Sequence, residues 1–213
     1  MTNVWNERAS MYVESDAHRT GEDLDTLVEW AEGASMALDV ATGGGHVARR
    51  LREAGIEVIT CDAAPGMHPD VVCTAESLPF ADHSFDVVAC RTAAHHFVDV
   101  GMAVSEMARV TRGTLILVDT VYMGDDVEAA EKLRDPSHVR NYTDAEWRSL
   151  VADTGLGIDQ VRFFEHTFDF GAWLARTGCE GDDAVRAEAL LGDRVVDGRL
   201  TLAKLAIRAV RGF

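Results

Sequence analysis

The sequence has few cationic side chains. Its 20 lysine and arginine residues stand against 36 aspartate and glutamate residues, which gives a formal net charge of −16. Contact with nucleic acids or anionic membranes requires clustered cations, and a membrane-spanning helix requires an apolar run of ~20 residues that this chain does not have. Residues 1–15 carry Glu7 and Glu14 in place of a hydrophobic signal core. We therefore expect a cytoplasmic protein with no nucleic-acid or membrane partner.

The chain also has no CxxC pair. Its four cysteines are scattered along the sequence: Cys61, Cys73, Cys90 and Cys179. Zinc sites and disulfide frameworks both depend on characteristic cysteine spacing. We therefore expect four reduced thiols and no metal site.

Short apolar runs alternate with stretches of helical periodicity, which predicts an α/β fold around a mostly parallel sheet. Seven strands are expected at residues 36–40, 57–61, 71–73, 85–90, 114–119, 161–168 and 200–208. After the first strand, Val47 and Leu51 recur at helical spacing, and Gly55 supplies a stop. Thr143 and Glu146 form a capping-box pattern that predicts a helix to about Thr154.

These elements predict a single domain of 213 residues with four parts. They are a helical lead-in or lid (1–30), a ligand-binding core (31–120), an insertion on the substrate side (121–142), and the remaining sheet with its cover (143–213). Open α/β sheets bind ligands beyond the carboxyl ends of their strands. We therefore expect the lead-in and the insertion to lie over the pocket.

A glycine-rich turn follows the first predicted strand and precedes a helix. Gly43 and Gly45 can adopt positive φ and let a ligand lie against the backbone, towards which the free N–H groups of the helix point. Asp39 ends the strand just before these glycines. A carboxylate there favours a ligand with positive charge, such as the ammonium and sulfonium of S-adenosylmethionine, and would repel a pyrophosphate.

A dinucleotide cofactor is the alternative for this turn. Gly43, Gly45 and Ala48 also fit the Gly-x-Gly-x-x-Ala fingerprint, and Asp62 stands near the expected spacing of ~20 residues for a ribose-binding carboxylate. In both interpretations Asp62 accepts two hydrogen bonds from a ribose diol. Its structural alternative is a helix N-cap.

The segments 75–80 (AESLPF) and 84–88 (SFDVV) extend this pattern. Together with the glycine turn, they make the chain resemble the class I S-adenosylmethionine-dependent methyltransferases, and most of all the group with ubiquinone and menaquinone biosynthesis methyltransferases. The resemblance is strong over residues 37–118. It implies one Rossmann-like, doubly wound sheet of seven strands, mostly parallel with an antiparallel last strand, and helices on both faces.

The resemblance also assigns cofactor-binding residues. The acidic residue and the glycines of the family motif fall on Asp39, Ala41, Gly43 and Gly45. Ala41 replaces the first glycine, a substitution without cost if its φ is negative. Asp62 would bind the ribose hydroxyls, and Ala75 and Glu76 would lie along the adenine. Thr74 stands where the family often has an aspartate for the adenine amino group.

Residues after the strand at 85–90 would lie beside the methionine and the transferred methyl group. Arg91 is expected to contact the cofactor through the methionine carboxylate. His95 and His96 cannot both face one site from an extended segment, and we favour His96 as a catalytic residue. Tyr12 of the lead-in is expected to close over the cofactor.

His138 is the second catalytic candidate. It lies in the polar insertion after Pro136, and an imidazole with a pKa near ~6.5 can accept a proton at neutral pH. The alternative is that His138 and Arg134 only stabilise the insertion. Asp119, at the end of the fifth strand, is a weaker candidate for the base.

The sequence thus predicts methyl transfer from S-adenosylmethionine to an O, N or C nucleophile of a small molecule, by in-line displacement that leaves S-adenosylhomocysteine. No Asn/Asp-Pro-Pro-aromatic tetrapeptide for a flipped base follows the fourth strand. A nicotinamide-dependent oxidoreductase remains an alternative. So does a protein that binds the sulfonium cofactor for other chemistry or for none. The sequence leaves the choice between monomer and homodimer open.

Overall fold

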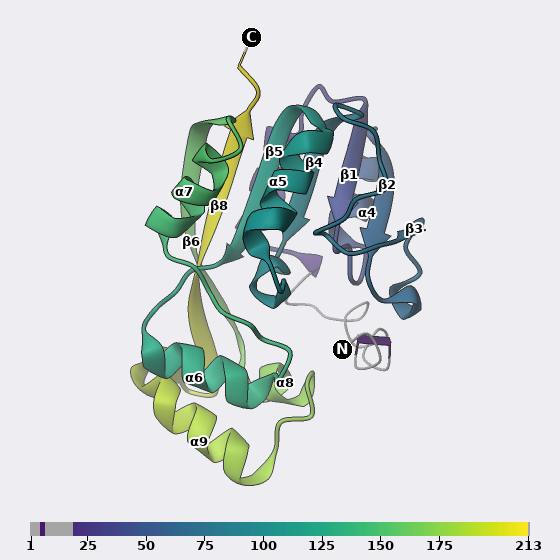
Figure 1. Cartoon of the computed structure of the whole chain (residues 1–213). Coiled ribbons are helices and arrows are strands. Elements are labelled where there is room, and N and C mark those ends of the chain that lie inside the picture. Colours follow the sequence, from purple (N-terminus) through teal and green to yellow (C-terminus); the bar gives the residue numbers. More distant parts are fainter. Residues whose placement is uncertain (1–4, 7–18, 213) are drawn as a thin grey trace.

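One mixed sheet runs through the computed structural model, which describes residues 5–6 and 19–212 (Figure 1). The strands are β1 (Met36–Val40), β2 (Glu57–Asp62), β3 (Val71–Val72), β4 (Phe85–Arg91), β5 (Thr111–Thr120), β6 (Gly157–Asp169), β7 (Val195–Val196) and β8 (Arg199–Val210). Their order is β3-β2-β1-β4-β5-β8-β6, and β7 pairs with β8. The five strands from β3 to β5 are parallel, whereas β8 is antiparallel to both β5 and β6. The predicted sheet with an antiparallel last strand is confirmed, and the two-residue β7 is an addition to it.

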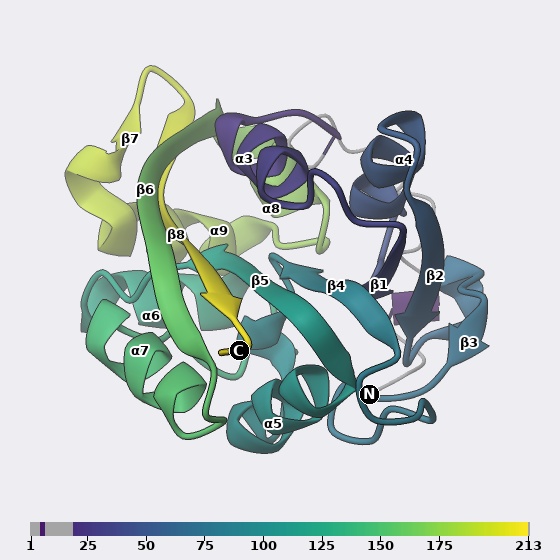
Figure 2. The same cartoon turned by 90° about the horizontal axis from the view of Figure 1, so that it is seen from above.

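Helices cover both faces of this sheet. In the described part of the chain, the α-helices include α3 (Glu22–Trp30), α4 (His46–Glu53), α5 (Val100–Val110), α6 (Asp125–Arg134), α7 (Asp144–Ala152), α8 (Phe170–Ala175) and α9 (Gly181–Leu191). Figure 2 shows α3 and α4 on one face of the sheet, and α5 and α7 on the other. None of the described helices is both long enough and apolar enough to cross a membrane.

Side chains along each strand point alternately to the two faces of the sheet, so each face has its own hydrophobic core. In β1, Ala37 packs with Leu24 and Leu51 of α3 and α4, while Leu38 packs with Met107 of α5 on the opposite face. Leu24 and the other core residues of α3 are almost completely buried. This helix of the lead-in is therefore part of the domain core.

A third cluster lies beyond the carboxyl ends of the parallel strands. Here α6, α8 and α9 pack around the first half of β8, with Phe170 and Trp173 of α8 against Leu200 and Leu202. Figure 1 shows these three helices below the main sheet, reached by the long strands β6 and β8. The insertion therefore carries a helix that packs on the C-terminal cover.

Local signals in the sequence correspond to observed helix ends. Gly55 has a φ of 85° just after α4. The capping box at α7 is confirmed, because the Thr143 hydroxyl accepts from the Glu146 N–H at 3.2 Å, and Glu146 Oε2 accepts from the Thr143 N–H at 2.8 Å.

Candidate active site

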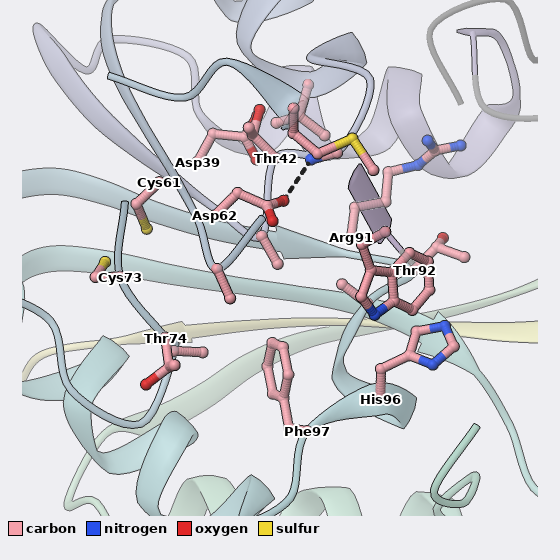
Figure 3. A pocket seen from close by; sticks show the side chains of 18 of the residues that line it. Asp39, Thr42, Cys61, Asp62, Cys73, Thr74, Arg91, Thr92, His96 and Phe97 are labelled. Carbon is pink, nitrogen blue, oxygen red and sulfur yellow. Dashed lines mark hydrogen bonds between the residues drawn. The ribbon is translucent and has the colours of Figure 1, made fainter. Parts of the chain in front are cut away.

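A cavity of about 300 Å³ opens at the carboxyl ends of β1, β2 and β4 (Figure 3). The expected cofactor-binding residues that line it are Asp39, Ala41, Gly43, Asp62, Ala75, Glu76 and Arg91. His96 lines it as well. Among the described residues, Gly45 and His138 do not border this cavity, and Tyr12 falls outside the described part of the chain.

Asp39 holds the glycine turn to the helix behind it. Its carboxylate is buried and accepts hydrogen bonds from the Thr42 hydroxyl at 2.6 Å and the Ala48 N–H at 3.1 Å. Burial raises the pKa of Asp39 to about 6, although these two hydrogen bonds oppose the increase. The residue therefore places a desolvated carboxylate at the cavity wall, where a cationic ligand would stabilise its charged form.

The turn itself requires left-handed backbone at three positions. Gly43 and Gly45 have φ values of 51° and 73°, and Ala41 has a φ of 54°. The expectation that alanine replaces the first glycine without cost requires a negative φ, and this condition is not met at Ala41. A left-handed conformation brings Cβ close to the following carbonyl oxygen, so alanine is strained at this position.

Asp62 lies across the turn, at the end of β2. Its Oδ2 accepts from the Gly43 N–H at 3.0 Å, the contact dashed in Figure 3, and its Oδ1 accepts from the Ala64 N–H at 2.8 Å. Burial is the main reason that its pKa is raised. The alternative of a helix N-cap is wrong, since Ala64 is the N-cap of the short 3₁₀ helix Pro65–Met67. Each carboxylate oxygen has a second lone pair, so Asp62 can still accept from a ligand hydroxyl.

Glu76 joins two loops at the other end of the cavity. Its Oε1 accepts from the N–H groups of Val98 and Asp99, at 3.2 and 3.4 Å. The same end is lined by Ala75 and Phe97, with the Phe97 ring labelled in Figure 3. This arrangement offers an apolar slot with backbone polar groups, which suits a flat heterocycle.

Arg91 lies at the wall of the cavity in a buried ion network. Its Nε is 2.9 Å from Asp23 Oδ2, and Lys204 Nζ is 3.0 Å from the same oxygen. Burial alone would raise the pKa of Asp23, but Lys204 and Arg91 together hold it well below its usual range. Asp23 and Lys204 could not be recognised as site residues from the sequence, because they lie far from Arg91 along the chain. The expected contact of Arg91 with a cofactor stays a prediction.

Three histidine rings gather beside the cavity. The ring centroids of His95 lie 4.1 Å from His96 and 5.4 Å from His138. His95 Nδ1 is 2.6 Å from Asp119 Oδ1. Burial opposes its protonation, but the Asp119 carboxylate more than compensates and raises the pKa of His95. The carboxylate of the candidate base Asp119 is therefore engaged in hydrogen bonds with His95.

His96 is neutral in this cluster. Its Nδ1 lies 3.1 Å from the Ser137 carbonyl oxygen, so Nδ1 carries the hydrogen and Nε2 carries the lone pair. Burial is the main cause that lowers the pKa of His96 to about 3, and His95 adds to the effect. His96 borders both the main cavity and a smaller one next to it.

His138 contacts α6. Its side chain is buried and its Nε2 lies 3.0 Å from Glu128 Oε1, while burial lowers the pKa of His138 to about 4. This geometry favours the interpretation that His138 stabilises the insertion. One ligand atom from each of Glu128, Glu131 and His138 lies within 4.8 Å of the others, a spacing suited to a metal ion. Asn141 donates its backbone N–H to Glu128 and its side-chain amide to both glutamates.

The four cysteines are free thiols, and Cys61 and Cys73 lie together in the cavity wall. A hydrogen bond between these two thiols, together with burial, raises the pKa of Cys61 far above its usual value. The expectation of four reduced cysteines stays a prediction.

Comparisons with known proteins place this geometry in a family. Residues 38–117 match the family described as "Methyltransferase domain". The uncharacterized methyltransferase YcgJ of Bacillus subtilis is 34% identical over 209 residues, an alignment that covers 85% of this chain and 82% of that protein. The demethylmenaquinone methyltransferase of Paenarthrobacter aurescens is 34% identical over 94 residues, which are 38% of this chain and 37% of that enzyme.

Solved structures agree with the sequence relatives. The crystal structure of YcgJ from Bacillus subtilis matches with a TM-score of 0.80 and 28% identity, covering 90% of this chain and 98% of that one. A putative methyltransferase of Bacillus halodurans (BH2331) matches with a TM-score of 0.78 and 29% identity, covering 91% and 100%. With the strand order and the glycine turn described above, the chain belongs to the class I S-adenosylmethionine-dependent methyltransferases.

Proposed function

We propose that this protein methylates a small molecule with S-adenosylmethionine, by in-line displacement at the methyl carbon. The observation that carries the proposal is the pair of carboxylates, Asp39 and Asp62, on either side of the glycine turn in one cavity. A nicotinamide dinucleotide would bring a pyrophosphate between these two acids, whereas the adenosine and amino-acid parts of S-adenosylmethionine bring hydroxyls and a cation.

The residues present fit such a cofactor. A Cβ added at Gly43 would meet one atom of the described residues within 4 Å, the Ala41 carbonyl oxygen at 4.0 Å, so the space above the turn is open to a ligand. Asp62 would accept from the ribose hydroxyls, and the slot between Ala75 and Phe97 would enclose the adenine. Asp39 and Arg91 lie at the end where the methionine part would reach.

When bound, S-adenosylmethionine supplies an electrophilic methyl group on a sulfonium. The chain contributes by aligning the acceptor and excluding water, which is the main requirement of a direct displacement. His96 is the candidate to accept a proton from the acceptor, because it borders both cavities and carries a lone pair on Nε2. Its lowered pKa makes it a weak base, so we expect placement to contribute more than proton transfer.

Calorimetry with S-adenosylmethionine, S-adenosylhomocysteine and NADH tests the cofactor assignment. We expect both sulfur nucleosides to bind and NADH to bind at least tenfold more weakly. Tight binding of NADH without binding of S-adenosylhomocysteine would favour the oxidoreductase alternative. Transfer of a labelled methyl group to members of an acceptor panel then separates a methyltransferase from a protein that only binds the cofactor.

A further inference from the structure

A second cavity adjoins the first at its Thr92 and His96 wall. It has a volume of about 60 Å³ and is bounded by the end of β5, by α6 and α8, and by β6 and β8. Thr92 and His96 line both cavities. A group in the smaller cavity would therefore lie next to a ligand in the larger one.

The walls of this second cavity are cationic in a strongly acidic protein. Arg134, Arg176 and Lys204 line it, and Glu131 is the acidic residue among its lining side chains in the described part of the chain. Since the whole chain carries a formal charge of −16, three cations around one small space run against the overall balance.

Lys204 shares its counter-ion, the Asp23 carboxylate, with Arg91. Its Nζ is 3.0 Å from Asp23 and 3.2 Å from the Thr92 hydroxyl, and the same Asp23 carboxylate also bonds Arg91. One carboxylate thus faces two buried cations. An anion in the second cavity would be attracted by the Lys204 ammonium and by the guanidinium groups of Arg134 and Arg176, and the low dielectric of the site would strengthen the attraction.

Arg134 is fixed in place before any ligand arrives. Its Nε donates to the Trp173 carbonyl oxygen at 3.0 Å, and its guanidinium carbon lies 4.7 Å from the centre of the Trp173 ring. A planar guanidinium held in this way recognises carboxylate or phosphate oxygens at a low cost in conformational entropy. A volume of about 60 Å³ has room for a few water-sized groups, so one carboxylate or phosphate group fits, and the rest of a larger acceptor does not.

We propose that the second cavity binds the anionic group, a carboxylate or a phosphate, of the methyl acceptor. The inference rests on the proposed function, because it requires a cofactor in the first cavity. The anionic group would anchor the acceptor between Arg134, Arg176 and Lys204, and its nucleophilic atom would project past Thr92 and His96 towards the first cavity. The acceptor class is therefore a small organic anion.

Binding of matched probes to the protein saturated with S-adenosylhomocysteine tests this proposal. Benzoate and phenyl phosphate carry the two anionic groups, and benzamide is the neutral probe of the same shape. We expect at least one anion to bind more than fivefold more tightly than benzamide. Whichever anion binds more tightly identifies the group that the cavity prefers.

Arg176→Gln is the informative variant, with Arg176→Lys as the form that keeps the charge. We expect Arg176→Gln to weaken binding of the preferred anion about fivefold, and Arg176→Lys to weaken it less, with benzamide and S-adenosylhomocysteine unaffected. Arg186→Gln is the matched control, because Arg186 is exposed on α9 and pairs with Asp183 at 3.6 Å.

Three results would overturn the inference: benzamide binding as tightly as both anions, no binding of either anion, or equal losses in Arg176→Gln and Arg186→Gln. Each of these results is measured on protein that binds S-adenosylhomocysteine, so none of them would contradict the proposed function. Failure to bind S-adenosylhomocysteine at all would instead remove the proposed function, and this inference with it.

Discussion

Arg91 and Asp23 form a buried two-point ion pair, with 2.9 Å between Nε and Oδ2 and 3.1 Å between Nη2 and Oδ1. The two side chains are 3% and 2% exposed, and Lys204, which joins them, is 5% exposed. The pair connects α3 to the end of β4, and Lys204 connects both to β8. Three distant segments of the chain are thereby fixed at the wall of the cavity.

Asp23→Asn should destabilise the protein strongly. The substitution removes the carboxylate that Arg91 and Lys204 share, and removing one partner of a buried ion pair typically costs about 3–5 kcal/mol. Urea unfolding followed by circular dichroism measures the change. Asp25→Asn on the same helix is the control, since Asp25 is 62% exposed and its pair with Arg50 should be worth less than about 1 kcal/mol. Equal losses in the two variants would show that the network does not stabilise the fold.

Asp62→Asn should weaken binding of S-adenosylhomocysteine by about 10- to 100-fold. The amide has one acceptor oxygen in place of two, and it loses the charge-assisted hydrogen bonds to a ribose, which are worth about 1.5–3 kcal/mol. Calorimetry gives the affinity. Asp70→Asn is a matched control, because Asp70 also accepts from a backbone N–H, that of Thr60 in β2 at 2.9 Å, but does not line the cavity. Unchanged affinity in Asp62→Asn would remove the ribose assignment.

The parallel half of the fold was predictable because its signals are local. The first strand has the predicted bounds, Met36–Val40, since its apolar run, Asp39 and the glycine turn are adjacent in sequence. The sixth strand is longer than the predicted 161–168, because it pairs with β8 along its whole length from Gly157 to Asp169. The alternation of apolar residues in the sequence does not show where the pairing of β6 with β8 ends.

The candidate site likewise contains residues that local signals predict and residues that they do not. Asp39, Gly43 and Asp62 come from strand ends and a turn, and all three line the cavity as expected. Asp23 and Lys204 carry no local motif, and they meet only because α3 packs on the sheet next to β8. The sequence places His138 in a polar loop. Its contact with Glu128 depends on the packing of α6 against that loop, which no local signal shows.

Ala41→Gly should stabilise the protein by about 0.5–1 kcal/mol. At a φ of 54°, alanine carries a steric penalty of about 1–2 kcal/mol that glycine avoids, and the greater entropy of glycine in the unfolded chain offsets part of the gain. Urea unfolding measures the difference. Ala54→Gly is the control, because Ala54 is exposed with a φ of −82° and should lose stability on substitution. A loss of stability in Ala41→Gly would contradict the strain at this turn.

His138→Gln should cost about 1 kcal/mol of stability, and His138→Ala about 2–3 kcal/mol. Glutamine can still donate to Glu128, whereas alanine leaves that carboxylate without this donor and opens a small void. Urea unfolding and calorimetry with S-adenosylhomocysteine check both variants, and we expect cofactor affinity to be unchanged. Loss of methyl transfer in His138→Gln, with stability and affinity intact, would instead support the role of His138 as a base.

Glu131 should make stability depend on pH in a defined direction. Burial raises the pKa of Glu131 to about 7 from the 4.5 expected of an unfolded chain. Between these values the folded protein holds a proton that the unfolded chain has released, so this group's contribution to the free energy of unfolding decreases as pH rises. The slope approaches about 1.4 kcal/mol per pH unit for one fully titrating group.

Glu131→Gln removes that dependence, because its amide does not titrate and its carbonyl oxygen can still accept from Asn141. We expect the free energy of unfolding of the variant, relative to the native protein, to increase by at least about 1 kcal/mol between pH 5 and pH 7.5. Urea unfolding at intervals across this range, on both proteins in the same buffers, measures the difference. Groups that titrate alike in both proteins, such as Asp39, cancel in the comparison, which therefore reports Glu131 together with its charge interaction with His95. A difference that stays constant with pH would mean that Glu131 ionises equally in the folded and unfolded states.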